Sequence, residues 1–137
     1  MAPKTLAKNI AKLTFTKKAS DVMIMDLKKI TDIADYFVLC SADSDTQVKA
    51  IANAVLDGTE KNGIRAWRTE GFSESLWIIL DYVDVVTHIF QKEVRKYYNL
   101  ERLWGDAKIE VLEDKPKSTM KKSVKLKKVK VERVPKK

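Results

Sequence analysis

The stretch WIILDYVDVVTHIFQKEVRKYYNLERLW, residues 77–104, decides the fold. Two apolar runs, residues 76–80 and 85–90, predict two strands. The connection between them, residues 81–84, has neither Gly nor Asn at its central positions, which disfavours a tight two-residue hairpin turn and favours a slightly longer loop. The rest of the stretch predicts a helix over QKEVRKYY and a last turn or two over LERLW, packed against the body of the domain.

Three further strands are expected upstream. Residues 21–27 (DVMIMDL) and 36–41 (YFVLCS) are apolar at nearly every position, as in a sheet that is covered on both faces. Residues 64–68 predict a shorter strand. A helical crossover joins parallel neighbours, whereas closely spaced strands favour antiparallel pairing. The sequence therefore predicts an α+β fold with a mixed sheet of about five strands and helices packed on it.

Two helices carry start signals. Ser44, followed three residues later by Gln47, forms a capping box. The helix that it opens is expected to end near Asn62, with Gly63 at the position that favours a left-handed backbone. Thr5 is expected to cap a short amphipathic helix at the N-terminus.

The formal net charge of +8 belongs to the ends of the chain. Residues 115–137 carry eleven Lys or Arg and a single Glu, whereas residues 21–114 carry 11 basic and 18 acidic groups. We expect one folded domain over residues 1–107 and a basic, disordered tail over residues 108–137. The tail is either a solubilising extension or an arm that contacts RNA phosphates without base stacking. The lysines favoured for that contact are Lys121, Lys122, Lys125, Lys127 and Lys128.

The composition excludes several classes of protein and site. A single Cys excludes an internal disulfide, and with one His the usual Cys and His zinc sites cannot be assembled. No apolar run has the length of a membrane span, and the N-terminus lacks the apolar stretch of a secretory signal. We therefore expect a cytoplasmic protein with no metal and no cofactor.

Two sets of residues are candidates for catalysis. Ser41, Asp43 and Asp45 follow a strand and could hold a divalent ion and a triphosphate, as in nucleotidyl transferases. The favoured alternative is that both carboxylates stabilise the helix start beside the Ser44 cap. His88 and Asp81 lie on adjacent predicted strands and could form an acid/base pair, although a structural or interface role is favoured because no nucleophile has a recognisable spacing.

The helix and turn that end the deciding stretch are rich in aromatic residues. Arg95 and Tyr98, three residues apart, share a helix face. Further apolar and aromatic side chains nearby are Tyr97, Leu100, Leu103 and Trp104. Trp, Tyr and Arg dominate interface hot spots, but the same residues can pack a helix on a sheet. Both interpretations stay open on spacing alone.

These residues resemble the ribosomal silencing factor (Iojap) family over roughly residues 5–107. The positions that carry the resemblance are Asp81, Asp84, His88, Phe90, Arg95, Tyr97, Tyr98, Leu100, Glu101, Leu103 and Trp104. The final Leu-Glu-x-Leu-Trp, with its upstream spacing, is the most specific part. The family carries a small Gly-Thr-Ser segment where this chain has Ala42, Asp43 and Ser44, which weakens the metal hypothesis further.

The resemblance implies a regulator rather than an enzyme. Its expected action is to bind the large ribosomal subunit through ribosomal protein number fourteen, to block joining of the small subunit and so to repress translation when nutrients are short. The implied fold is related to the nucleotidyl transferases without their active site, and the free protein is expected to form a homodimer. The residues expected to face the partner or to frame that face are Trp77, Asp81, His88, Arg95, Tyr98 and Glu101. A metal-dependent nucleotidyl transferase stays the alternative.

Overall fold

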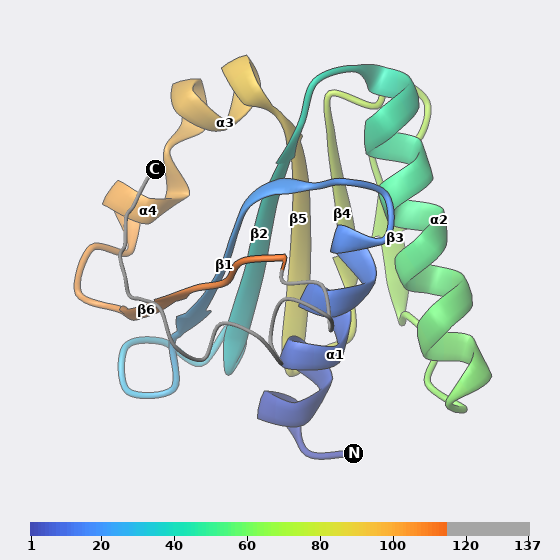
Figure 1. The fold of residues 1–137 in the computed structure, drawn as a ribbon. Coiled ribbons are helices and arrows are strands. Elements are labelled where there is room, and N and C mark those ends of the chain that lie inside the picture. The colour runs from blue at the N-terminus through green and yellow to red at the C-terminus, as the bar shows by residue number, and fades with distance from the viewer. Residues whose placement is uncertain (115–137) are drawn as a thin grey trace, which may run out of the picture.

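The computed structural model describes residues 1–114 and contains four helices and six strands within them (Figure 1). The helices are α1 (Pro3–Phe15), α2 (Asp45–Lys61), α3 (Lys92–Tyr98) and α4 (Leu100–Leu103). The strands are β1 (Ser20–Asp26), β2 (Tyr36–Ala42), β3 (Arg68–Glu70), β4 (Trp77–Asp81), β5 (Val85–Gln91) and β6 (Lys108–Val111). None of the helices in this part of the chain has both the length and the apolar character needed to cross a bilayer.

The strands form one mixed sheet in the order β3-β4-β5-β2-β1-β6. The two central strands, β2 and β5, pair in parallel, and every other pair is antiparallel. All seven residues of β2 are buried, as the continuous apolar run predicts for a strand covered on both faces. The predicted α+β class and mixed pairing are confirmed, and the sheet has six strands instead of about five.

The extra strand, β6, lies in the segment that we assigned to the tail. Residues 108–111 (KIEV) alternate charged and apolar side chains, and all four are exposed. They form a strand because they pair in antiparallel register with β1. Just beyond the strand, the Leu112 amide donates to the Val22 carbonyl over 2.9 Å. The prediction of disordered chain from residue 108 is therefore wrong for this segment.

The helices cover the two faces of the sheet unequally. α1 and α2 lie together on one face, where the larger apolar cluster is centred on buried residues such as Ile10, Val38 and Ile51 (Figure 1). α3 and α4 lie beyond the other face, where a smaller cluster includes Phe37, Phe90 and Leu100. The second face is thus covered only by two short helices, and several side chains beside them stay half-buried.

Both long helices begin and end for local reasons. The Ser44 hydroxyl accepts from the Gln47 amide over 3.1 Å, and Gly63 has a φ of +78°, so the predicted cap and end of α2 are confirmed. The prediction that Thr5 caps α1 is wrong. The N-cap residue is Ala2, and Pro3 occupies the first turn, where its fixed φ suits a helix and its missing amide hydrogen costs nothing.

The strand predicted over residues 64–68 is displaced toward the C-terminus. The Ile64 amide still donates to Thr59 of α2 over 3.0 Å, so the chain is completing the helix end at this point. Pairing starts only after the Trp67 amide donates to the Asp81 carbonyl over 2.7 Å, with Arg68 opposite Asp81. The apolar residues of this segment therefore do not form the strand, and the Trp67 side chain is 67% exposed.

Candidate functional site

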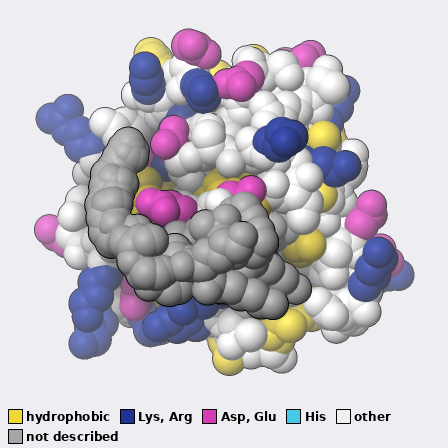
Figure 2. All heavy atoms as spheres, in the orientation of Figure 1, with side chains coloured by type: hydrophobic (Ala, Val, Ile, Leu, Met, Phe, Trp, Pro, Cys, Tyr) yellow, Lys and Arg dark blue, Asp and Glu magenta, His cyan; other side chains and the backbone are white. Residues whose placement is uncertain are grey.

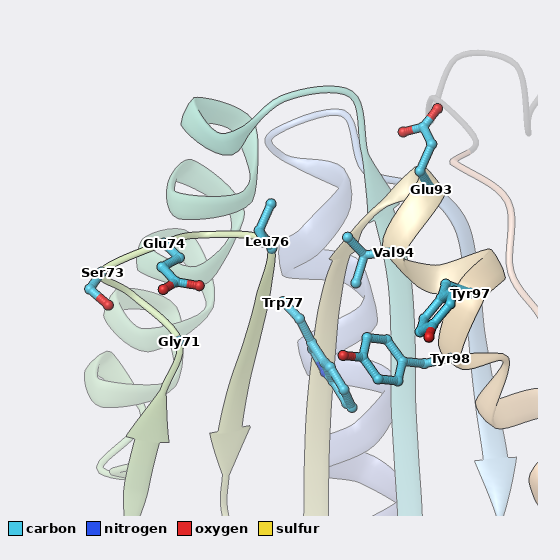
Figure 3. Close-up of a pocket in the computed structure, with 9 residues that line it drawn as sticks. All are labelled: Gly71, Ser73, Glu74, Leu76, Trp77, Glu93, Val94, Tyr97 and Tyr98. Atoms are coloured by element: carbon cyan, nitrogen blue, oxygen red, sulfur yellow. The ribbon is translucent and has the colours of Figure 1, made fainter.

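A groove of about 620 Å³ lies between the loop at residues 71–76 and helix α3 (Figure 3). The side chains and backbone that line it come from Gly71, Ser73, Glu74, Leu76, Trp77, Glu93, Val94, Tyr97 and Tyr98. Only Trp77 and Tyr98 of this set are among the residues that the sequence predicts to face a partner. The loop was missed because a short polar segment before a strand carries no signal of its own.

The loop wall of the groove is built by backbone contacts. Gly71 has a φ of +94°, and a Cβ atom there would stand 2.1 Å from the Trp77 carbonyl oxygen. The Ser75 amide donates to the Gly71 carbonyl over 2.9 Å, which closes the loop. At its end the Gln91 amide donates to the Leu76 carbonyl over 2.9 Å, and the Gln91 side-chain amide donates to the Ser75 carbonyl. The loop is therefore closed on itself and fixed to β5 at its C-terminal end.

Aromatic rings form the apolar surface of the groove. The half-buried Trp77 ring stacks on Phe90 with centroids 4.8 Å apart, and the Tyr98 ring also packs against Trp77, with its centroid 4.8 Å from that of the indole. Tyr97 lies edge-on to Tyr98 at 5.1 Å. Tyr97 is 82% exposed and Tyr98 52% exposed, so these rings face solvent rather than the core.

Two exposed leucines extend this apolar surface. Leu76 is 45% exposed at the loop edge, and Leu103 is 68% exposed on α4. Of the two interpretations left open by the sequence, packing or interface, Leu103 therefore fits the interface. Leu100 is buried, and Trp104 is half-buried with its ring edge-on to Phe37. Contiguous exposed apolar groups of this kind are typical of a protein-docking site.

Arg95 holds this surface in place from beneath. Its side chain is buried, and its Nη1 donates to the Asp21 carbonyl over 2.7 Å and to the Ser41 hydroxyl over 2.8 Å. Its Nε donates to a carboxylate oxygen of Glu101 over 3.1 Å. The guanidinium therefore joins β1, β2, α3 and α4. Of the two roles expected for Arg95, facing the partner or framing that face, its burial and contacts fit the frame.

The turn between α3 and α4 determines which side chains face outward. Asn99 has a left-handed backbone with φ 50° and ψ 60°, and its side-chain oxygen accepts from the Arg102 amide over 3.3 Å. Asn is one of the few residues that adopt this conformation readily. The turn brings Glu101 back toward Arg95 while Tyr97, Tyr98 and Leu103 stay at the surface.

His88 does not form an acid/base pair with Asp81. The register places Ile79 opposite His88, and Asp81 instead accepts from the Val83 amide over 2.8 Å and lies 3.7 Å from Arg68. His88 is buried, and desolvation lowers its pKa from 6.5 to about 3. The imidazole is thus neutral near neutral pH and has a structural role in the smaller cluster.

Ser41, Asp43 and Asp45 are engaged in other contacts. The Ser41 hydroxyl is buried and accepts from Arg95, and Asp43 pairs with Lys92 over 2.8 Å. Asp45 accepts from the Thr46 amide at the start of α2, as the helix-start interpretation predicts. Within residues 1–114 no group of three His, Cys, Asp or Glu side chains is arranged to hold a metal ion. The geometry does not support the transferase hypothesis.

The surface outside the groove carries charges of both signs. Figure 2 shows acidic and basic side chains interspersed over the face that Figure 1 presents, outside the part covered by grey atoms. The excess of acidic residues in 21–114 therefore does not form one continuous patch on that visible face. The tail lysines named above lie outside the described residues.

Known proteins resemble the chain over most of its length. Residues 1–135 match the family model described as ribosomal silencing factor during starvation. The ribosomal silencing factor RsfS of Bacillus subtilis is 45% identical over 107 residues, which cover 78% of this chain and 91% of that protein. The chloroplastic protein Iojap of Zea mays is 31% identical over 103 residues, which cover 75% of this chain and 45% of that protein.

Solved structures agree with the fold described above. A crystal structure of a protein from Chromobacterium violaceum matches with a TM-score of 0.75 and 30% identity, covering 85% of this chain and 98% of that one. A second, from Bacillus halodurans, matches with a TM-score of 0.68 and 34% identity, covering 80% of this chain and 98% of that one.

Proposed function

Because the chain belongs to the ribosomal silencing factor family, we propose that it represses translation by binding the large ribosomal subunit and preventing the small subunit from joining it. The partner on that subunit is ribosomal protein number fourteen, and the effect is needed when nutrients are short. We further propose that it acts in the cytoplasm.

The observation that carries the proposal is the exposed aromatic surface at the groove. Tyr97, Tyr98 and Leu103 are at least half exposed, yet they sit on a corner that Arg95 and Asn99 hold rigidly. Rigid, exposed aromatic side chains lose little conformational entropy on binding and are enriched in interface hot spots. They also lie in the block of sequence that resembles the family. We therefore assign the docking surface to Leu76, Trp77, Tyr97, Tyr98 and Leu103.

The mechanism is steric and requires no catalysis. A bound protein of 15.7 kDa excludes the small subunit by volume if its position overlaps the area where the subunits meet. Two of the candidate catalytic residues have structural contacts, which supports this view: His88 is buried and neutral, and the buried Ser41 hydroxyl accepts from Arg95. Subunit exclusion thus explains repression without a reaction.

The basic segment at residues 115–137 adds a second contact in this proposal. Eleven Lys or Arg in 23 residues are suited to neutralising phosphates of the adjacent ribosomal RNA. Such contacts are independent of sequence and weaken steeply as salt is raised. Deleting these residues is expected to weaken binding at low salt and to reduce its salt dependence, without abolishing it. Formation of a homodimer by the free protein stays a prediction.

Co-sedimentation and light scattering test the proposal directly. The full chain should co-sediment with large subunits and slow their joining to small subunits. The double variant Tyr97→Ala/Tyr98→Ala should lower the affinity by at least about tenfold. Trp67→Ala is the matched control, because Trp67 is an aromatic residue of similar exposure on the other side of β4 and does not line the groove.

Two outcomes would count against the proposal. If the full chain neither co-sediments with large subunits nor slows subunit joining, the proposed function is wrong. If Trp67→Ala and the tyrosine variant weaken binding equally while both stay folded, the function stands but the docking surface has been placed wrongly.

A further inference from the structure

The docking groove has an acidic rim. Figure 3 shows Glu74 on the loop side and Glu93 at the start of α3, with the Glu93 carboxylate directed outward from the Trp77 and Tyr98 rings. Both glutamates are exposed, and neither forms a salt bridge or a side-chain hydrogen bond with another residue of 1–114. Within the same part of the chain no Lys or Arg lines the groove. The groove therefore combines an aromatic surface with two carboxylates that form no salt bridge within residues 1–114.

Other carboxylates close to the groove are neutralised. Asp43 pairs over 2.8 Å with Lys92, the residue before Glu93, and Glu101 pairs with Arg95 over 3.1 Å. Glu93 also lies in the first turn of α3, where a negative charge favours the helix. That contribution explains Glu93 alone, because Glu74 lies in a loop outside any helix. Because both residues line the groove, a role that they share would concern what enters it.

We propose that the groove binds a basic segment of the ribosomal protein partner, in which an apolar side chain lies between two Lys or Arg residues. The apolar side chain fills the space over Trp77 and Tyr98, and the two basic groups pair with Glu74 and Glu93. This inference rests on the proposed function and names the chemistry that the docking surface selects.

The physical case combines three attractions. Burying an apolar side chain against the indole and phenol rings provides most of the affinity. A guanidinium or ammonium group beside these rings also gains cation–π attraction. The exposed carboxylates add little affinity each, but they steer association and fix the orientation of the bound segment.

The same charges disfavour RNA in this groove. Phosphate groups would be repelled by Glu74 and Glu93, whereas ribosomal proteins that lie beside RNA are themselves basic. The groove and the basic residues 115–137 therefore serve different partners: protein for the groove and RNA for the tail. The tail is itself a basic segment with isolated apolar residues, so its binding to the groove must appear as an outcome of the test.

The test compares two double variants of the full chain. Glu74→Gln/Glu93→Gln removes the rim charges, and Asp32→Asn/Asp57→Asn makes the same change in net charge at exposed residues that do not line the groove. The dissociation constant for purified large ribosomal subunits is measured at low salt and at about 0.5 M salt, where the Debye length is only a few Å. Thermal unfolding shows whether each variant keeps its fold.

The rim variant should bind about threefold to tenfold more weakly than the control at low salt, and the difference should shrink at high salt. Equal binding by the two variants would overturn the rim assignment while leaving the proposed function intact. Tighter binding by the rim variant would also overturn it, because loss of the charges would then release a competing tail or admit RNA. If the unmodified chain fails to bind, the proposed function itself fails.

Discussion

The indole Nε1–H of Trp77 donates to Nδ1 of His88 over 3.1 Å. Because Nδ1 accepts, the proton of the neutral imidazole is on Nε2, which has no hydrogen-bond partner among residues 1–114. His88 is also packed edge-on to Phe37 at 4.5 Å. The single histidine thus orients the tryptophan of the docking surface from within the core.

Burial of His88 makes stability depend on pH. Its folded pKa of about 3 lies below the ordinary value of 6.5, so between these values the unfolded chain binds more protons than the folded one. Stability from this group is complete above about pH 6.5 and is lost as the pH falls toward 3. From about pH 7 to about pH 4.5 the loss should be about 2–3 kcal/mol. Denaturant unfolding of the wild type and of His88→Phe at several pH values measures this loss. The free energy of unfolding should fall more steeply with falling pH in the wild type, since the carboxylates affect both proteins equally. Parallel pH profiles would show that His88 is not buried as a neutral group.

Replacing Arg95 should destabilise the fold rather than merely weaken binding. Arg95→Ala leaves the Glu101 carboxylate, the Ser41 hydroxyl and the Asp21 carbonyl without their buried donor, which should cost about 3–5 kcal/mol of unfolding free energy. Arg95→Lys should recover only part of this stability, since a Lys ammonium group cannot reproduce the separate donors of the planar guanidinium. Denaturant titration is the measurement. A fully stable Arg95→Ala variant would contradict the framing role and favour direct contact of Arg95 with the partner.

The loop wall of the groove depends on the absence of a side chain at Gly71. Gly71→Ala combines a positive φ with a Cβ position 2.1 Å from the Trp77 carbonyl oxygen. We expect a loss of about 2–3 kcal/mol and weaker ribosome binding, because the loop must move away from β4. Gly63→Ala is the control: its φ is +78°, but no atom lies within 4 Å, so only about 1 kcal/mol of backbone strain is expected. Equal thermal shifts would mean that the contact with Trp77 is unimportant.

Asp43 tests the transferase alternative. Its carboxylate pairs with Lys92 near the surface, and such exposed pairs contribute about 0–1 kcal/mol. Asp43→Asn should therefore leave the thermal midpoint nearly unchanged. Titration of the wild type with a nucleoside triphosphate and Mg²⁺ should give no saturable stabilisation. A saturable shift that disappears in Asp43→Asn would revive the hypothesis built on Ser41, Asp43 and Asp45.

The positions of the buried strands could be predicted from the sequence, because each of these strands is itself a run of apolar residues. β2, β4 and β5 begin and end within a residue of the expected positions. β3 and β6 are exposed edge strands without such a pattern. Their positions follow from pairing with β4 and β1, which no local segment of sequence encodes.

The site was predicted in part for a related reason. Tyr98 and Trp77 could be identified from aromatic composition and spacing. The sequence left two roles open for Arg95, because its partners at Asp21 and Ser41 lie 74 and 54 positions away, and spacing within a helix cannot reveal a buried polar contact of that range. The loop residues Glu74 and Leu76 were missed because they join the site only through the fold.

The strand order has a consequence for the synthesis of the protein. β2 lies between β1 and β5, and β1 lies between β2 and β6, so both N-terminal strands keep an open edge while translation continues. β2 gains its second neighbour only once Val85–Gln91 have emerged, and β1 only after Lys108–Val111. Pairings of such long sequence separation form slowly, and until then the nascent chain exposes backbone that can pair with other strands. The sheet is thus completed only after Lys108–Val111 have been synthesised.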